Sequence, residues 1–182
     1  MNDELQQPEP DDKDWTWVIE RECPDCGFDA SRPSTSEFAA IFSSWPDQWR
    51  EVLERDDVSV RPAPKVWSPL EYACHVRDVL ALTDFRLRLM LDHDNPVFAN
   101  WDQDETALES EYPHADPSAV GEAIAANTST VVAILDGLDG SAWSRPGVRS
   151  NGSLFTIESF SRYILHDPIH HYWDVTGSRA TT

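Results

Sequence analysis

The sequence predicts an all-α protein, a four-helix bundle with a short irregular N-terminal arm. Three observations support this prediction. Four segments of about 20 residues each carry helix-capping signals, and strand signals are sparse after residue 20. A chain of 182 residues with 40% hydrophobic residues and eight tryptophans can also bury a sizeable core. The chain therefore contains enough material for one ordinary domain with a short appendage.

Capping residues mark the helix starts. The clearest start combines Ser68 as the cap, Pro69 at the first helical position and Glu71 at the third. Asp116 and Pro117 open another helix by the same chemistry, and Ser34 with Glu37 forms a capping box for the first. The predicted helices span about 34–55 with a break at Trp45–Pro46, 68–92, 116–136, and from a start between Ser153 and Thr156 up to Gly177.

The N-terminal region differs in composition from the rest of the chain. Residues 1–14 are acidic, contain two prolines and have almost no apolar side chains, so we expect a disordered acidic tail. Residues 15–33 form the predicted arm, in which an apolar, β-prone stretch at 15–19 precedes a tight turn at Cys23–Cys26. Residues 34–182 form the predicted bundle.

Two linkers of the bundle are unusually long. Residues 94–115 and 138–153 exceed the usual connection between helices, and long ordered loops in compact domains are often functional. The first linker carries Trp101 and Asp102. We expect Trp101 and Trp173 near a pocket, and Asp102 is a candidate to orient a ligand histidine.

The charge of the chain excludes several classes of partner. It carries 33 Asp and Glu against 14 Lys and Arg, a net charge of −19 with a pI of about 4.4. Phosphate backbones and anionic membranes repel such a surface, so we expect no binding to nucleic acid or membranes. No run approaches the roughly 18 apolar residues of a membrane span, and the acidic N-terminus does not fit a secretory signal. We therefore expect a cytoplasmic protein with reduced thiols.

Three histidines are candidate metal ligands. His166 and His170 are four residues apart, which places both rings on one helical face, as chelation from a helix requires. His75 lies inside the apolar half of the helix at 68–92. A histidine pair on one helix and a single histidine on another are suited to a three-His site in a bundle core. The competing interpretation is a set of ordinary core histidines with a chance His-x-x-x-His spacing.

Other residues near these histidines modify the interpretation. His171 points about 100° away from His170 and is the weaker ligand candidate. Pro168, inside the chelating turn, predicts a kink or a restart of the helix at Asp167. Glu71 precedes His75 by one turn on the same stripe, and Arg86 follows about three turns later.

These motifs resemble those of the DinB-like (YfiT-like) family of metalloproteins. The stretch from Trp67 to His75 resembles the W-S-x-x-E-x-x-x-H opening of the family's second helix, and His166-x-x-x-His170 resembles its second metal motif. Residues 100–104 are also similar, and the resemblance covers about 34–177. It implies an up-down-down-up bundle, often dimeric, that holds a divalent metal ion on His75, His166 and His170. Related branches include thiol-dependent transferases and isomerases.

The cysteines allow two interpretations. Cys23-Pro-Asp-Cys26-Gly resembles one knuckle of a zinc ribbon, but no second Cys-x-x-Cys follows to supply the remaining ligands. A reduced pair in a surface turn is therefore the favoured interpretation, and a redox pair or a half-built metal site is the alternative. Cys74 is predicted to be a small buried filler.

The sequence thus favours a metal-dependent enzyme, a transferase or hydrolase. A small thiol is the leading nucleophile and water the second, with Glu71 as general base and Arg86 as the contact for a substrate carboxylate. We expect zinc as the ion, with nickel or iron as alternatives, and a small thiol or anionic molecule as the partner of a homodimer. The alternative is a non-enzymatic, metal-stabilised bundle or a metal or thiol sensor, in which Glu71 or Asp167 closes the site.

Overall fold

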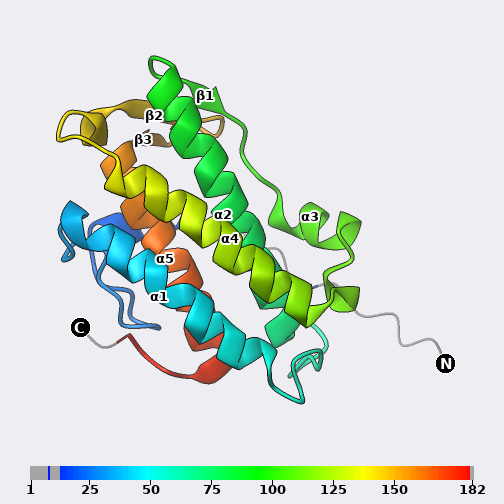
Figure 1. Cartoon of the computed structure of the whole chain (residues 1–182). Helices are drawn as coiled ribbons and strands as arrows, with labels where there is room; N and C mark the ends of the chain where they lie inside the picture. Colours follow the sequence, from blue (N-terminus) through cyan, green and yellow to red (C-terminus); the bar gives the residue numbers. More distant parts are fainter. Residues whose placement is uncertain (1–7, 9–12, 181–182) are drawn as a thin grey trace.

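The computed structural model describes residue 8 and residues 13–180 (Figure 1). Most of the predicted acidic tail, 1–14, therefore lies outside the described residues. Four long helices run side by side and form the bundle. A short fifth helix, α3, lies in the connection between the second and third of them. The helices are α1 (Thr35–Leu53), α2 (Pro69–Asp92), α3 (Gln103–Glu109), α4 (Pro117–Asp136) and α5 (Ile157–Thr176).

Local sequence chemistry explains where the long helices begin. Ser68 and Glu71 form the predicted capping box of α2, with Pro69 in the first helical position. Gly177, at a φ of 70°, ends α5 in the left-handed conformation. The predicted break at Pro46 is wrong, because α1 continues through this residue. Buried aromatic side chains on both sides of Pro46, those of Trp45 and Trp49, pack into the core and hold the helix together.

Connection lengths set the topology. A long connection that contains α3 and the 3₁₀ turn Tyr112–His114 follows α2, and it allows α4 to run in the same direction as α2. The result is the up-down-down-up bundle. By length and composition alone α4 could cross a membrane, but it packs against α1 and α2, as a bundle helix does. The core is built from buried aromatic and aliphatic side chains of all four long helices, among them Phe38, Trp49, Leu80, Ile124 and Leu165.

A small sheet at one end of the bundle was not predicted (Figure 1). Strand β1 (Val97–Phe98) pairs in parallel with β2 (Pro146–Arg149), which pairs antiparallel with β3 (Leu154–Thr156). Strands this short show no alternation that a sequence pattern could reveal. The pairing joins the two long linkers to each other. Gly147 permits the close approach, since a Cβ there would lie 2.8 Å from Met90 and 2.9 Å from Phe98.

The N-terminal arm packs on α5. The expected strand at 15–19 is a single 3₁₀ turn, Thr16–Ile19. A tight loop follows at Cys23–Phe28, in which Gly27 has a φ of 77°. The turn lies at the surface, as predicted, with Pro24 and Asp25 exposed, but the side chains of Cys23 and Cys26 are free and fully buried. They are buried because both thiols point toward His166 and His170 of α5 while the tip of the loop stays exposed.

Candidate metal centre

A cavity of about 730 Å³ lies between α2, α5, the two long linkers and the N-terminal arm. The two helices and the linkers each supply both ionisable and aromatic side chains to its wall. The predictions that Trp101 and Trp173 lie near a pocket are confirmed. Residues in the wall include Trp67, His75, Arg86, Trp101, Asp102, Arg149, Tyr163, His166, Asp167, His170, His171 and Trp173.

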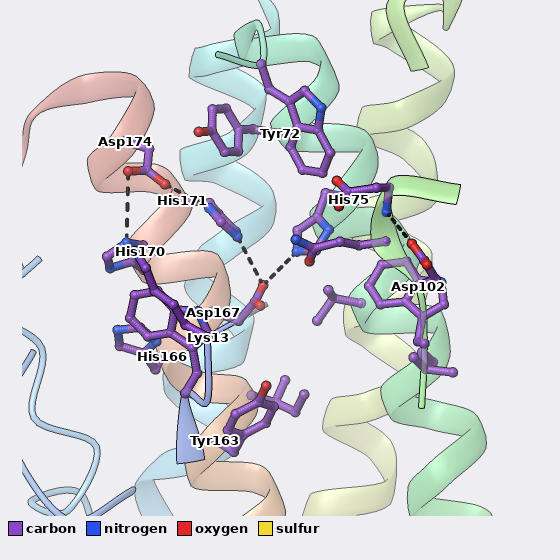
Figure 2. Close-up of a pocket in the computed structure, with 18 of the residues that line it drawn as sticks. Lys13, Tyr72, His75, Asp102, Tyr163, His166, Asp167, His170, His171 and Asp174 are labelled. Carbon is purple, nitrogen blue, oxygen red and sulfur yellow. Dashed lines mark hydrogen bonds and ion pairs between the residues drawn. The ribbon is translucent and has the colours of Figure 1, made fainter. Parts of the chain in front are cut away.

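One group of possible ligands, the cavity triad, consists of His75, Asp167 and His171 (Figure 2). His75 comes from α2, and the other two residues lie one turn apart on α5. The ligand atoms of the three side chains lie within 4.8 Å of one another. His75 Nε2 is 3.4 Å from Asp167 Oδ1, and His171 Nε2 is 3.9 Å from the same oxygen. Two nitrogens and a carboxylate oxygen thus converge on one point.

The surroundings of the triad favour a bound cation. His75 Nδ1 and Nε2 and Asp167 Oδ1 are buried and make no hydrogen bond. Buried polar atoms without a hydrogen bond are rare, and a bound ion is one established reason for them. Tetrahedral zinc ligation separates a nitrogen and an oxygen ligand by about 3.4 Å. The distance from His75 to Asp167 matches this value, and the distance from His171 exceeds it by about 0.5 Å, which a small rotation of the side chain removes.

Contacts with neighbouring side chains orient the two imidazoles of the triad for metal binding. His171 Nδ1 is 2.8 Å from Asp174 Oδ2, so the carboxylate fixes the proton on Nδ1 and leaves Nε2 to face Asp167 (Figure 2). The ring of His75 stacks on Trp101 at 5.3 Å and contacts Trp67 at 5.5 Å. Asp174 thus fixes the orientation of the His171 ring, and the two tryptophans fix that of the His75 ring.

The carboxyl group of Asp167 is ionised in this environment. Burial alone would raise its pKa, but the nearby imidazoles of His75, His171 and His166 outweigh burial and hold the pKa below its usual range. With a metal ion bound, the triad would supply one carboxylate charge from Asp167 and two imidazole nitrogens, because histidine ligates a metal only through a deprotonated ring nitrogen.

Asp174 gives a first prediction. We expect Asp174→Ala to weaken metal binding by the triad about 10–100-fold, because His171 loses the acceptor that fixes its tautomer. Competition with a chelating dye measures the affinity. Asp136→Ala, which removes an exposed acid at the end of α4, is the charge-matched control and should leave the affinity unchanged. Equal affinities in both variants would contradict an orienting role for Asp174.

A second group, the arm cluster, lies beside the triad and consists of Cys23, Cys26, His166 and His170. All four residues are buried or nearly so, and their ligand atoms lie within 4.8 Å of one another. Burial lowers the pKa of His166 to about 4, with a smaller contribution from the neighbouring His170, so this ring is neutral near pH 7. Burial raises the pKa of Cys26 to about 12 in the metal-free protein.

The structure divides the three histidines predicted to share one ion. His75 belongs to the cavity triad, whereas His166 and His170 belong to the arm cluster. The partners of His75 are the next residues along α5, Asp167 and His171, which repeat the same four-residue spacing one position later. From the sequence, Asp167 is predicted both as the cap of a helix restart and as a ligand that closes the site, and His171 ranks as the weaker ligand candidate. Helix α5 also continues through Pro168 without the predicted restart.

Glu71 does not join the triad. Its carboxylate accepts hydrogen bonds from Arg61 Nε at 2.8 Å and from the backbone N–H of Ser68 at 2.8 Å, and Arg61 Nη2 contacts its other oxygen. Both side chains of the pair are buried. Glu71 lines a smaller pocket together with Arg61, next to the start of α2. These contacts give Glu71 a structural role in capping α2 and neutralising Arg61.

This arrangement predicts a loss of stability for Glu71→Ala. We expect the free energy of unfolding to fall by about 3–5 kcal/mol, because the substitution removes the carboxylate that neutralises the buried guanidinium of Arg61. Denaturant unfolding measures the change, and Glu122→Ala, at an exposed position on α4, is the control. A variant that unfolds like the wild type but loses turnover would restore the prediction of Glu71 as general base.

Arg86 lies in the wall of the cavity, as a contact for substrate requires. Its Nη2 donates to the carbonyl of Ala99 at 2.9 Å, while its Nε is buried without a hydrogen-bond partner. The guanidinium also lies 5.0 Å from the ring of Phe98. Burial lowers the pKa of Arg86 to about 10, with a smaller contribution from the positive charge of Arg149, so Arg86 still carries a positive charge near pH 7.

Asp102 caps α3 by accepting hydrogen bonds from the backbone N–H groups of Asp104 and Glu105.

The fold and the site together define the class of protein: a four-helix bundle whose second and last long helices present candidate metal ligands to a common cavity. The chain belongs to the DinB superfamily, whose family model matches residues 47–175. This match confirms the resemblance seen in the motifs.

A solved structure supports the same fold. The chain is similar to the structure described as "YfiT from Bacillus subtilis is a probable metal-dependent hydrolase with an unusual four-helix bundle topology". The TM-score is 0.74 at 17% sequence identity, and the alignment covers 90% of this chain and 94% of that one. The comparison with curated proteins found no match.

Proposed function

We propose that this protein is a metal-dependent hydrolase that acts on a small anionic substrate, with its ion held by the cavity triad. The observation that carries the proposal is the convergence of His75, Asp167 and His171 at the wall of the cavity, where two of the three side chains have buried ligand atoms without hydrogen bonds. The description of the structurally similar protein as a probable metal-dependent hydrolase supports the same reaction class.

The number of ligands favours a catalytic ion over a structural one. Three protein ligands leave at least one coordination position open, and the cavity gives a small molecule access to it. A divalent ion bound there supplies a Lewis acid that activates a coordinated water or thiol near neutral pH. A divalent ion ligated by one carboxylate and two imidazoles would keep a net positive charge, which would attract an anion.

Two arginines in the cavity wall favour an anionic substrate. Arg86 keeps an unsatisfied buried donor, and Arg149 lies near enough to lower its pKa. Arg149 is positioned by Tyr163, whose hydroxyl lies 3.4 Å from Nη1 and whose ring lies 5.5 Å from the guanidinium. Guanidinium groups bind carboxylates through paired hydrogen bonds. Both arginines therefore provide binding and orientation for a carboxylate in a chain that is otherwise strongly acidic.

The test is turnover by protein loaded with a single defined metal. Zinc is the first choice, with nickel and iron as parallel preparations. The substrates are small esters and amides that carry a carboxylate, assayed with water alone and with an added small thiol. Metal-dependent release of acid without thiol supports hydrolysis, whereas turnover only with thiol would replace it by thiol transfer. Stoichiometric metal binding without turnover in any arm would favour the non-enzymatic sensor.

A further inference from the structure

We propose that the arm cluster is a structural zinc site of the Cys₂His₂ type that fastens the N-terminal arm to α5. Its ligands are two thiolates from the arm and two imidazoles from α5: Cys23, Cys26, His166 and His170. The site is separate from the cavity triad, and it does not depend on the proposed reaction.

The distances suit a tetrahedral zinc ion. All four ligand atoms lie within 4.8 Å of one another, and Cys23 Sγ is 3.6 Å from His170 Nδ1. Bonds of about 2.3 Å to sulfur and about 2.0–2.1 Å to nitrogen at tetrahedral angles separate these two atoms by about 3.6 Å. The two histidines are four residues apart on α5 and the two cysteines three apart in the loop, spacings typical of structural zinc sites.

The loop around the cysteines has the backbone of a metal-binding knuckle. Cys23 N–H donates to the carbonyl of Phe28 at 2.9 Å, and Gly27 N–H donates to the carbonyl of Cys23 at 2.9 Å. The N–H of Phe28 points at Cys26 Sγ at 3.5 Å, a contact that stabilises a thiolate. The positive φ of Gly27 closes the turn and brings both sulfur atoms to the same side.

Burial and charge favour a closed, neutral centre. Both cysteines are fully buried, and Nε2 of His166 is buried without a hydrogen-bond partner. Two thiolates and two neutral imidazoles cancel the charge of a divalent ion, so the occupied site suits an interior position. The ring of Trp15 covers the histidines at 5.6 and 5.2 Å. Four protein ligands leave no position for substrate, which is the arrangement of a structural site.

The site joins three parts of the chain that are far apart in sequence. The C-terminal segment also packs on the loop: Arg179 Nη2 donates to the carbonyl of Pro24 at 2.6 Å, and Ala180 N–H donates to the carbonyl of Cys26 at 2.9 Å. A zinc ion would therefore fix the N-terminal arm, α5 and the C-terminal segment together. In a zinc ribbon, a second Cys-x-x-Cys supplies the other two zinc ligands. Here His166 and His170 of helix α5 would supply them.

The first experiment uses the metal alone as the probe. Full-length protein is stripped of metal under reducing conditions and titrated with cobalt(II), which reports thiolate ligation by a charge-transfer band and tetrahedral geometry by intense visible absorption. We expect both signals in the wild type and in His171→Ala, and their loss in Cys26→Ser and His166→Ala. Wild-type protein without a thiolate-to-cobalt band, or a band that survives Cys26→Ser unchanged, would overturn the proposal.

The second experiment does not depend on the folding of ligand variants. Cys74→Ala removes the third cysteine, which is buried in the core away from the cluster, and leaves Cys23 and Cys26 as the only thiols. In zinc-loaded protein we expect both thiols to resist a thiol reagent and to react after addition of a strong chelator, with release of one zinc per chain. A pair that is isolated as a disulfide, or that reacts equally with and without chelator, would instead identify a redox pair or free thiols.

Discussion

Replacing His171 with alanine is expected to abolish turnover and to weaken metal binding at the cavity triad by at least about 100-fold. The ion would lose one of three protein ligands, and the two that remain, His75 and Asp167, provide neither the geometry nor the affinity for a stable centre. The measurements are metal content of the isolated protein and rate with the substrate found in the screen. The arm cluster should keep its zinc, so the metal content should fall by one ion per chain rather than to zero.

Two variants sharpen this test. His93→Ala removes an exposed histidine at the end of α2 and should change neither metal content nor rate. Asp167→His replaces the carboxylate by a third imidazole, and we expect it to retain the ion, because nitrogen ligands also suit zinc. If His166→Ala removed the catalytic ion and His171→Ala did not, the three-His set of His75, His166 and His170 would be correct after all.

Removal of zinc from the arm cluster is expected to destabilise the protein by about 4 kcal/mol or more. A ligand present at 1,000 times its dissociation constant stabilises the folded state by about 4.1 kcal/mol, and structural zinc sites commonly bind more tightly than that. The measurement is the free energy of unfolding of reduced protein with zinc and with a strong chelator. The same chelator should change the stability of Cys26→Ser much less.

The cavity triad provides the control for this prediction. An ion there would sit at the wall of the cavity and bridge two helices that already pack through the core, so His171→Ala should lower the stability far less than Cys26→Ser. Limited proteolysis gives a local readout, since loss of zinc should expose the arm near residues 20–30 before the bundle unfolds. Equal stability of Cys26→Ser and the wild type, with and without zinc, would contradict a structural ion in the arm.

The helices could be predicted from the sequence because their determinants are local. Ser68, Pro69 and Glu71 specify the start of α2 within a single turn, and four amphipathic segments of similar length imply a bundle. The small sheet could not be predicted, because each strand is two to four residues long and the partner of β1, strand β2, lies about 50 residues further along the chain. The continuity of α1 through Pro46 also depends on distant packing against aromatic side chains rather than on local propensity.

The candidate site was predicted only in part, for a similar reason. Spacing identified α2 and α5 as the helices that carry ligands and placed Arg86 toward the cavity. It did not decide which of two overlapping pairs on α5 faces His75, because adjacent residues differ by only about 100° around the helix. The position of the arm settles this question in the structure: Cys23 and Cys26 lie against His166 and His170, which leaves Asp167 and His171 to face α2. The sequence of α5 alone does not determine how the arm packs on it, so it could not reveal which pair faces His75.

The two neighbouring pairs on α5 have a kinetic consequence. All four side chains line the cavity, but Asp167 and His171 are 26% and 20% exposed, whereas His170 is 12% exposed and the ring of Trp15 lies over His166 and His170. Ions at the two centres should therefore exchange with solution on different timescales, although the centres share one turn of helix. In a pulse of isotopically labelled zinc, the cavity triad should take up the label within the mixing time of the experiment. The arm cluster should take it up only as fast as the arm lifts from α5. The slow phase would then measure how often the N-terminal arm opens in the folded protein.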